Sequence, residues 1–214
     1  MSDVDRIRLF DHLSKTLGDS PALDAMRRVP RERFVPEHLG NQAYQNTALA
    51  IGHGQTISQP QMVAAASIAL DLHGDEHVLE VGAGSGYQAA VLSAMLPRGS
   101  VVAVERIPAL VAMARRNLSA AGFSDVTVLE AGSILGAPDC APFDAILVSA
   151  SAPAVPETLL AQLKPGGRIV LPVGTRERQT LTRVWVNPDG RVREELGPCT
   201  YVPLLGEEAW PEGS

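Results

Sequence analysis

The middle of the chain alternates short apolar runs with longer segments whose apolar residues recur at helical spacing. Apolar runs of about four to eight residues bounded by turn residues predict buried strands, whereas the longer periodic segments predict helices. Strands are expected at residues 77–81, 100–105, 126–130, 143–148 and 168–173, and helices at residues 87–96, 108–121 and 156–163. Strands that alternate with helices form parallel sheets joined by right-handed crossovers. We therefore expect a doubly wound α/β core.

The residues before this core predict an N-terminal helical extension. Apolar residues at helical spacing indicate helices at residues 4–17, 21–26 and 60–72. The second of these helices begins with Pro21 after Ser20, and serine is a favoured N-cap residue while proline is favoured at the first helical position. Residues 29–59 contain several prolines and glycines, so we expect a long loop-rich stretch there. Such stretches inside compact domains are usually functional.

The residues after the core predict an antiparallel hairpin. Residues 179–186 and 191–196 are strand-like, and the four residues between them, Asn-Pro-Asp-Gly, favour a turn. The expected fold is therefore α/β, with a Rossmann-like, mainly parallel sheet, an antiparallel C-terminal hairpin and an N-terminal helical extension. We expect a single domain over residues 1–214. Its parts are a substrate-binding extension (1–60), a cofactor-binding core (75–173) and a hairpin region (174–214).

Composition narrows the classes of function. The chain has 18 lysines and arginines against 24 aspartates and glutamates, and this net charge of −6 argues against nucleic acid as a partner. Aromatic residues make up only 4%, so a surface that stacks unpaired bases is not expected. No apolar run is long enough to span a membrane or to form a signal peptide, which predicts a cytoplasmic protein. The two cysteines and five histidines show no metal-ligand spacing.

A glycine-rich loop follows the first core strand and precedes a helix. It contains Gly82, Ala83, Gly84 and Gly86, and glycines at such a turn let a ligand approach bare main chain. A dinucleotide fingerprint would need glycine at position 87, where this chain has tyrosine. The observed pattern, Glu-x-Gly-x-Gly-x-Gly, is instead typical of methyltransferases that use S-adenosylmethionine. We therefore expect S-adenosylmethionine as the cofactor, with its methionine part over this loop.

Two acidic residues at strand ends are candidates for binding the same cofactor. Glu105 ends the second core strand, where a carboxylate can accept hydrogen bonds from both ribose hydroxyls in nucleoside-binding α/β folds. Glu80 stands just before the glycine loop and can accept from the cofactor's ammonium group, directly or through water. Either residue alone could equally be a solvated charge at a strand end. Beside the glycine loop, both favour a cofactor site.

Three segments carry more specific motifs. Residues 50–60 read Ala-Ile-Gly-His-Gly-Gln-Thr-Ile-Ser-Gln-Pro, residues 26–36 include Val-Pro-Arg-Glu-Arg-Phe, and residues 78–90 surround the glycine loop. Shorter motifs follow at residues 105–106, 143–145, 163–168 and 202–204. Together these motifs resemble the protein-L-isoaspartate O-methyltransferase family. The resemblance covers roughly residues 23–210, and the segment 52–60 is far more specific than the glycine loop.

The resemblance implies an enzyme that repairs damaged proteins. Members of this family esterify the free α-carboxylate of an isoaspartyl residue, and the ester collapses to a succinimide whose hydrolysis returns some normal aspartyl linkage. The expected partners are therefore isoaspartyl-containing proteins and peptides, bound by a monomer. Ser58 matches the active-site serine of the family. The other positions that the resemblance assigns to the cofactor site are Thr56, Ile57, Arg106, Gly132 and Ser133.

The expected chemistry needs no catalytic base. A carboxylate with a pKa of about 4 is already ionised at neutral pH, and the chain shows no His/Asp or Cys/His arrangement. A site that excludes water and aligns the reacting atoms would supply most of the acceleration. Ser58 can hold the substrate carboxylate by a hydrogen bond without acting as a nucleophile. The structural alternative for Ser58 is the N-cap of the helix that begins near Pro60.

The sequence departs from the family at two positions. The family's Gly-Asp-Gly after the third strand, whose aspartate accepts from the adenine amino group, is replaced here by Ala131-Gly132-Ser133. The lost charge-assisted hydrogen bond is worth roughly 1.5–3 kcal/mol unless Ser133, backbone groups or water compensate. The family's Tyr-x-Asp is replaced by Tyr44-Gln45-Asn46, which removes a negative charge beside the signature.

Two other functions remain open at this point. The same carboxyl chemistry could act on a dedicated peptide substrate, which a neighbouring precursor-peptide gene would indicate. Alternatively, the chain could be a degenerate module that binds S-adenosylmethionine without catalysis. Gly132 favours the degenerate module, whereas the intact glycine loop and Ser58 argue against it.

Overall fold

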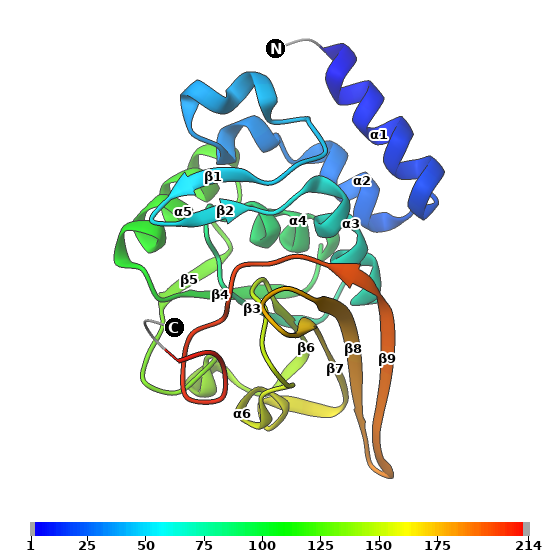
Figure 1. Ribbon diagram of the computed structural model, residues 1–214, viewed down its shortest axis with the longest axis vertical. Helices are drawn as coiled ribbons and strands as arrows, with labels where there is room; N and C mark the ends of the chain where they lie inside the picture. Colours follow the sequence, from blue (N-terminus) through cyan, green and yellow to red (C-terminus); the bar gives the residue numbers. More distant parts are fainter. Residues whose placement is uncertain (1–2, 212–214) are drawn as a thin grey trace.

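The computed structural model describes residues 3–211, which form a seven-stranded sheet, flanking helices and a separate two-stranded sheet (Figure 1). The strand order is β5-β4-β3-β6-β7-β8-β9. Strands β3, β4, β5, β6 and β7 run parallel to one another, and β8 and β9 are added antiparallel at one edge. The strands are β3 (His77–Val81), β4 (Ser100–Glu105), β5 (Thr127–Glu130), β6 (Phe143–Val148), β7 (Leu163–Gly174), β8 (Gln179–Asn187) and β9 (Gly190–Cys199). The predicted α/β class, with its mainly parallel sheet and antiparallel C-terminal hairpin, is confirmed.

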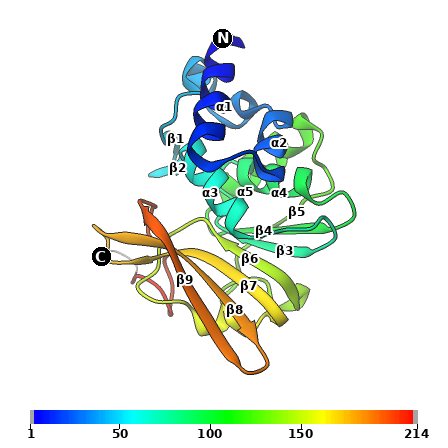
Figure 2. The same cartoon turned by 90° about the vertical axis from the view of Figure 1, so that its right-hand side faces the viewer.

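The two faces of the sheet are covered differently. One face carries Val78, Ala103 and Ala145, which pack in one apolar cluster with residues of five helices. These helices are α1 (Asp3–Leu17), α2 (Pro21–Arg28), α3 (Pro60–Ala69), α4 (Tyr87–Met95) and α5 (Pro108–Ala121). The opposite face packs against the short α6 (Glu157–Leu160) and irregular segments. Figure 2 shows the helices gathered on one side of the strands. None of the helices in the described range is long and apolar enough to span a membrane.

The predicted loop-rich stretch contains more regular structure than expected. Its strands β1 (Leu49–Gly52) and β2 (Gln55–Ile57) form an antiparallel hairpin, and two short 3-10 helices cover residues Arg31–Phe34 and Glu37–Gln42. The prediction of a loop-rich stretch at residues 29–59 therefore missed this hairpin and the two 3-10 helices. Strands of three and four residues are too short to show a clear period, although β1 does alternate buried and exposed side chains.

The predicted helix over residues 156–163 is also wrong in length, because α6 ends at Leu160 and β7 begins at Leu163. Pro165 disfavours helical conformation in the residue before it, and Leu163 pairs with Phe143 at the start of β7. At the N-terminal end, Ser20 is confirmed as the N-cap of α2, since its hydroxyl accepts from the Leu23 backbone N–H at 3.4 Å.

Candidate active site

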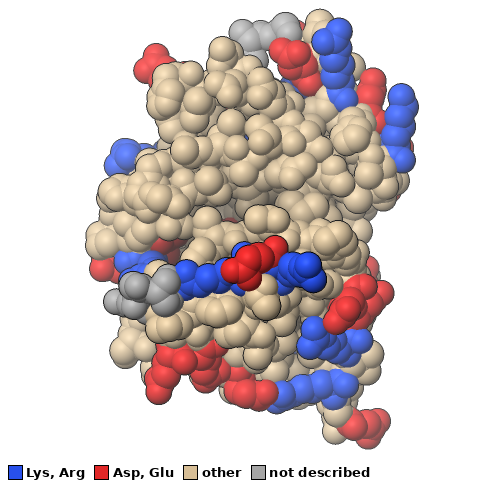
Figure 3. Space-filling model, viewed as in Figure 1, with Lys and Arg blue, Asp and Glu red and all other residues tan. Residues whose placement is uncertain are grey.

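A cavity of about 600 Å³ opens at the carboxyl ends of the parallel strands. The ends of β3, β4 and β6 and the residues after β5 line one side, and β2 and residues 202–208 line the others. A ligand crevice is expected at this edge of a doubly wound sheet, where the strand order reverses between β3 and its neighbours β4 and β6. The surface is hollowed in the middle of the face in Figure 3, and charged side chains cross the face just below the hollow.

The glycine loop contributes bare backbone to this cavity. Gly82 and Gly84 line it, whereas Ala83 is buried and Gly86 lies outside the lining. Gly86 has a positive φ of 88°, and a Cβ added there would lie 3.1 Å from Leu118 and 3.3 Å from the backbone of Ala114. Gly86 therefore allows α4 to begin against α5, so its observed contacts are those of helix packing.

Glu105 joins the glycine loop to the end of β4. Its Oε2 accepts from the Gly84 backbone N–H at 3.0 Å, and its Oε1 accepts from the Ile107 backbone N–H at 3.0 Å. The side chain is buried but lines the cavity. Because each carboxylate oxygen has capacity for a further hydrogen bond, Glu105 can hold two hydroxyl donors of a ligand while it fixes the loop.

Glu80 is a buried residue with an unsatisfied carboxyl oxygen, and it lies outside the cavity lining, in contact with the lining residue Ser149. It is fully buried in β3, its Oε1 accepts from the Ser149 hydroxyl at 3.1 Å, and its Oε2 has no partner. The pKa of Glu80 is raised to about 8, chiefly by burial; the Ser149 hydrogen bond opposes this rise and repulsion from Glu105 adds to it. Ser149 itself lines the cavity. A buried acceptor without a partner fits a site that receives a cationic ligand group, since buried charges are normally paired.

The predicted site residues in and after the β1–β2 hairpin lie in different surroundings. Gln55 and Thr56 in β2 line the cavity, while Ile57 points into the apolar core and is 4% exposed. Ser58 follows β2, is half-buried and lies outside the cavity lining. The alternative role of Ser58 as a helix N-cap is wrong, because Gln59 is the N-cap of α3 and makes no side-chain capping bond.

The remaining predicted positions lie along the wall that follows β4 and β5. Arg106, Gly132 and Ser133 all line the cavity. Apart from its two chain neighbours, no atom of residues 3–211 lies within 4 Å of the position that a Cβ on Gly132 would take, so this wall has free space. Asn46, the other departure from the family, is bound on both sides of its amide. Its Nδ2 donates to Gln61 Oε1 and its Oδ1 accepts from the Gln61 backbone N–H, both at 3.0 Å.

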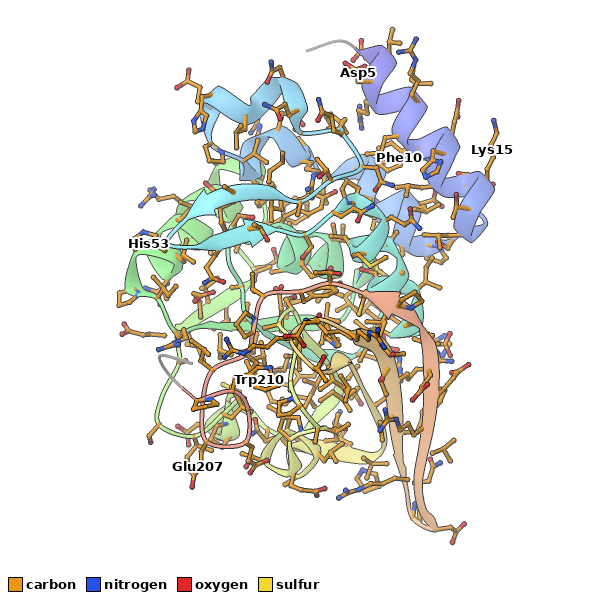
Figure 4. The ribbon with its side chains drawn as sticks, viewed as in Figure 1. Asp5, Phe10, Lys15, His53, Glu207 and Trp210 are labelled. Carbon is orange, nitrogen blue, oxygen red and sulfur yellow. The ribbon has the colours of Figure 1, made fainter. Side chains whose placement is uncertain are left out.

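A wall that the residue-level prediction misses comes from residues 202–208, after β9. Ser151 holds this segment to the sheet, because its N–H donates to Val202 and its carbonyl accepts from Leu204, both at 2.8 Å. In Figure 4, Glu207 and Trp210 mark this C-terminal segment in the lower part of the view, and His53 marks the tip of the β1–β2 hairpin above it. The Val-Pro-Leu motif at residues 202–204 was the available signal, although nothing in its spacing indicates contact with a ligand.

Comparisons with known proteins agree on one family. A family model described as protein-L-isoaspartate(D-aspartate) O-methyltransferase matches residues 7–209. Protein-L-isoaspartate O-methyltransferase 2 of Marinobacter nauticus is 48% identical over 99% of this chain and 97% of its own length. The protein-L-isoaspartate O-methyltransferase of Methanopyrus kandleri is 49% identical over 97% of this chain and 94% of its own.

Solved structures resemble this fold closely. A protein-L-isoaspartate O-methyltransferase structure has a TM-score of 0.84 and 29% identity, covering 95% of this chain and 67% of the other. A Plasmodium falciparum structure described as a protein of the same kind, in complex with S-adenosyl-L-homocysteine, has a TM-score of 0.80. It is 23% identical, covers 91% of this chain and 95% of the other, and supports the fold alone.

Proposed function

Because the chain belongs to the protein-L-isoaspartate(D-aspartate) O-methyltransferase family, we propose that its cavity binds S-adenosylmethionine and that Ser58 holds the isoaspartyl carboxylate beside it. The chain is a methyltransferase that uses S-adenosylmethionine to methylate L-isoaspartyl residues, which starts the repair of damaged proteins. What is proposed is the role of each residue. The observation that carries the proposal is the pair Glu105 and Glu80. Glu105 lines the cavity, and Glu80, whose Oε2 has no partner, is joined to the cavity wall by its hydrogen bond with Ser149.

The cofactor is held by backbone and carboxylates in this proposal. Glu105 accepts from the ribose hydroxyls, and Glu80 receives the ammonium group with its free Oε2. Gly82 and Gly84 let the methionine part approach the main chain, while Gly132 and Ser133 border the adenine end. When bound, S-adenosylmethionine supplies a methyl group on a positively charged sulfur.

The chain contributes alignment and exclusion of water. No residue has to remove a proton, because an isoaspartyl carboxylate is ionised at neutral pH. The Ser58 hydroxyl, on a half-buried residue directly after β2, donates to this carboxylate and orients it. Residues 202–208 and β2 enclose the cavity from two sides, so that the reacting groups meet away from bulk water.

Replacing Ser58 with alanine is the direct test of this arrangement. We expect Ser58→Ala to lower kcat for an isoaspartyl peptide by about tenfold to a hundredfold, since a hydrogen bond to a charged group is worth about 1.5–3 kcal/mol. The affinity for S-adenosylhomocysteine, measured by titration calorimetry, should stay unchanged. Ser93→Ala is the matched control, because the Ser93 hydroxyl donates to Asp125 away from the cavity. Wild-type turnover in Ser58→Ala would refute the proposed role of Ser58. Equal methyl transfer by the wild-type enzyme to a matched aspartyl peptide would refute selectivity for the isoaspartyl linkage.

Introducing an aspartate at position 132 tests the adenine end. We expect Gly132→Asp to tighten the binding of S-adenosylhomocysteine by about tenfold, because a carboxylate would accept a hydrogen bond from the adenine amino group. The free space around the Gly132 Cβ position accommodates the side chain. Gly132→Ala serves as the control that adds a Cβ without a carboxylate. Equal affinity in all three proteins would show that the adenine does not lie at this wall.

The proposal extends to the setting in which the enzyme works. The net charge of −6 and the cavity at the strand ends fit recognition of one carboxylate in a damaged protein or peptide, without a role for nucleic acid. We expect the enzyme to act as a monomer in the cytoplasm, and light scattering in solution tests the first of these expectations.

A further inference from the structure

One arginine in the N-terminal extension has no place in the chemistry described so far. Arg31 begins the 3-10 helix Arg31–Phe34, and it is the largest of the fully buried side chains within residues 3–211. Moving a guanidinium out of water costs several kcal/mol or more unless its donors and its charge are compensated. The contacts around the buried Arg31 guanidinium therefore determine whether this cost is compensated.

Three separate segments hold the Arg31 guanidinium. Nε donates to the carbonyl of Ala43 and Nη2 donates to the carbonyl of Ser58, both at 2.8 Å. The guanidinium carbon lies 4.8 Å from the centre of the Tyr87 ring, which is within range of a cation–π interaction. Burial lowers the pKa of Arg31, and the Tyr87 hydroxyl opposes this shift, so the group stays charged.

The side chains that shift the pKa of Arg31 are tyrosines rather than carboxylates, and its Nη1 has no acceptor among the described residues. Buried charges that serve stability are usually paired, and replacing them with apolar residues is often neutral or stabilising. The structure therefore leaves one nitrogen of the buried Arg31 guanidinium without an acceptor, and burial makes such an unpaired donor costly. Such a cost is expected where a residue serves the geometry of a functional site.

Two of the three segments adjoin residues to which ligand roles are proposed. Ser58 is the residue proposed to hold the substrate carboxylate, and Tyr87 is the first residue of α4, directly after the glycine loop. Tyr87 is itself fully buried and packs edge-to-face on Phe34, so its ring is a fixed reference for the loop. Arginine presents its donors in a rigid plane, which lets one side chain hold the Ser58 backbone at a set distance from Tyr87.

We propose that Arg31 is a positioning residue for methyl transfer, which holds the Ser58 segment in register with the glycine loop through Ala43, Ser58 and Tyr87. This inference rests on the proposed role of Ser58. Arg31 contacts neither ligand in this account. It acts because a misplacement of about 1 Å in a transfer reaction can cost about a hundredfold in rate.

The test compares Arg31→Lys and Arg31→Met with wild type. Lysine keeps the charge but cannot donate in two fixed directions while stacking on Tyr87, and methionine removes the charge. We expect kcat for an isoaspartyl peptide to fall by about tenfold or more in both variants, while the Kd of S-adenosylhomocysteine changes by less than about threefold. Arg33→Met is the matched control, because Arg33 lies in the same short helix, is exposed and donates to the Ala120 carbonyl at 2.5 Å.

A purely structural arginine would give a different result. In that case the melting temperature, the cofactor affinity and kcat would decline together, or both variants would fail to fold, and either outcome overturns the proposal. Wild-type kcat in a folded Arg31→Lys or Arg31→Met variant overturns it as well. We expect the melting temperature of Arg31→Met to equal or exceed that of wild type, because an unpaired buried charge is removed.

A double-mutant cycle separates this inference from the function on which it rests. If Arg31 acts through Ser58, the double variant Arg31→Met/Ser58→Ala should have the kcat of Ser58→Ala alone. Additive losses would overturn the role of Arg31 and leave that of Ser58 intact. No loss in Ser58→Ala itself would instead overturn the proposed function of that residue.

Discussion

Replacing Glu105 with alanine is expected to weaken the binding of S-adenosylhomocysteine by a hundredfold or more. Two ribose hydroxyls would lose a charged acceptor, and each such hydrogen bond contributes about 1.5–3 kcal/mol. The variant would also release the Gly84 and Ile107 backbone N–H groups that Glu105 holds at 3.0 Å. The glycine loop would then lose its fixed position as well, so the loss should exceed that from either hydroxyl alone. Titration calorimetry measures the affinity directly.

The neighbouring strand offers a matched control for this prediction. Glu130 ends β5 and pairs in register with Glu105, but it is exposed and does not line the cavity. Glu130→Ala should bind the ligand as wild type does. Glu105→Gln, which keeps one acceptor oxygen, should fall between wild type and Glu105→Ala. A Glu105→Ala variant that binds within about threefold of wild type would contradict the ribose assignment.

Cofactor affinity is expected to rise steeply with pH between 6 and 8. In the free protein Glu80 is protonated below its pKa of about 8. A cationic group within about 4–6 Å of a carboxyl favours its charged form and lowers its pKa by about 1–3 units. Binding of the ammonium group therefore releases a proton, and the affinity should increase by up to about tenfold per pH unit on the acid side of pH 8.

The same carboxyl has the opposite effect on the stability of the free protein. The folded-state pKa of Glu80 lies above its ordinary value of 4.5, so the folded protein binds more protons than the unfolded chain between these two values. The contribution of Glu80 to stability is thus full below about pH 4.5 and is lost as the pH rises through 8. We expect the melting temperature of the free protein to fall over this range relative to Glu80→Gln.

Calorimetry in buffers of different ionisation enthalpy checks the assignment. At pH 7, about 0.4 to 0.9 proton should be released per ligand bound by wild type, for a pKa of about 8 lowered by about 1–3 units, and none by Glu80→Gln. The acid-side dependence of affinity should also flatten in Glu80→Gln. Proton release of the same size in both proteins would show that another group accounts for it and that Glu80 does not receive the ammonium.

The core strands were predictable because of where they lie in the sheet. The observed bounds of β3, β4 and β6 coincide with the predicted ranges, since strands buried on both faces read as continuous apolar runs between turn residues. The β1–β2 hairpin was not predictable from periodicity, because its conformation depends on Gly52, His53 and Gly54, which all have positive φ. The short α6 likewise depends on the pairing of Leu163 with Phe143, which is a tertiary contact.

The residues of the candidate site also fall into those that follow from strand order and those that depend on tertiary contacts. Residues that directly follow parallel strands, such as Gly82, Glu105 and Gly132, line the cavity because the carboxyl ends of these strands meet at one edge. Ser149 occupies an equivalent position after β6, so topology alone could have indicated it. Arg31 carried no such signal, because an arginine in a loop-rich segment is usually exposed and only the folded chain brings Ala43, Ser58 and Tyr87 around it.

The wall formed by residues 202–208 also has a consequence for biosynthesis. Domains tend to fold from the N-terminal side during translation, and here the glycine loop, Glu80 and Glu105 emerge from the ribosome long before this wall. A nascent chain can thus form the parallel sheet and its two carboxylates while the crevice is still open to water. Only when Val202 and Leu204 reach Ser151 is that crevice enclosed. The newly made enzyme should therefore gain tight cofactor retention as one of its last steps of maturation.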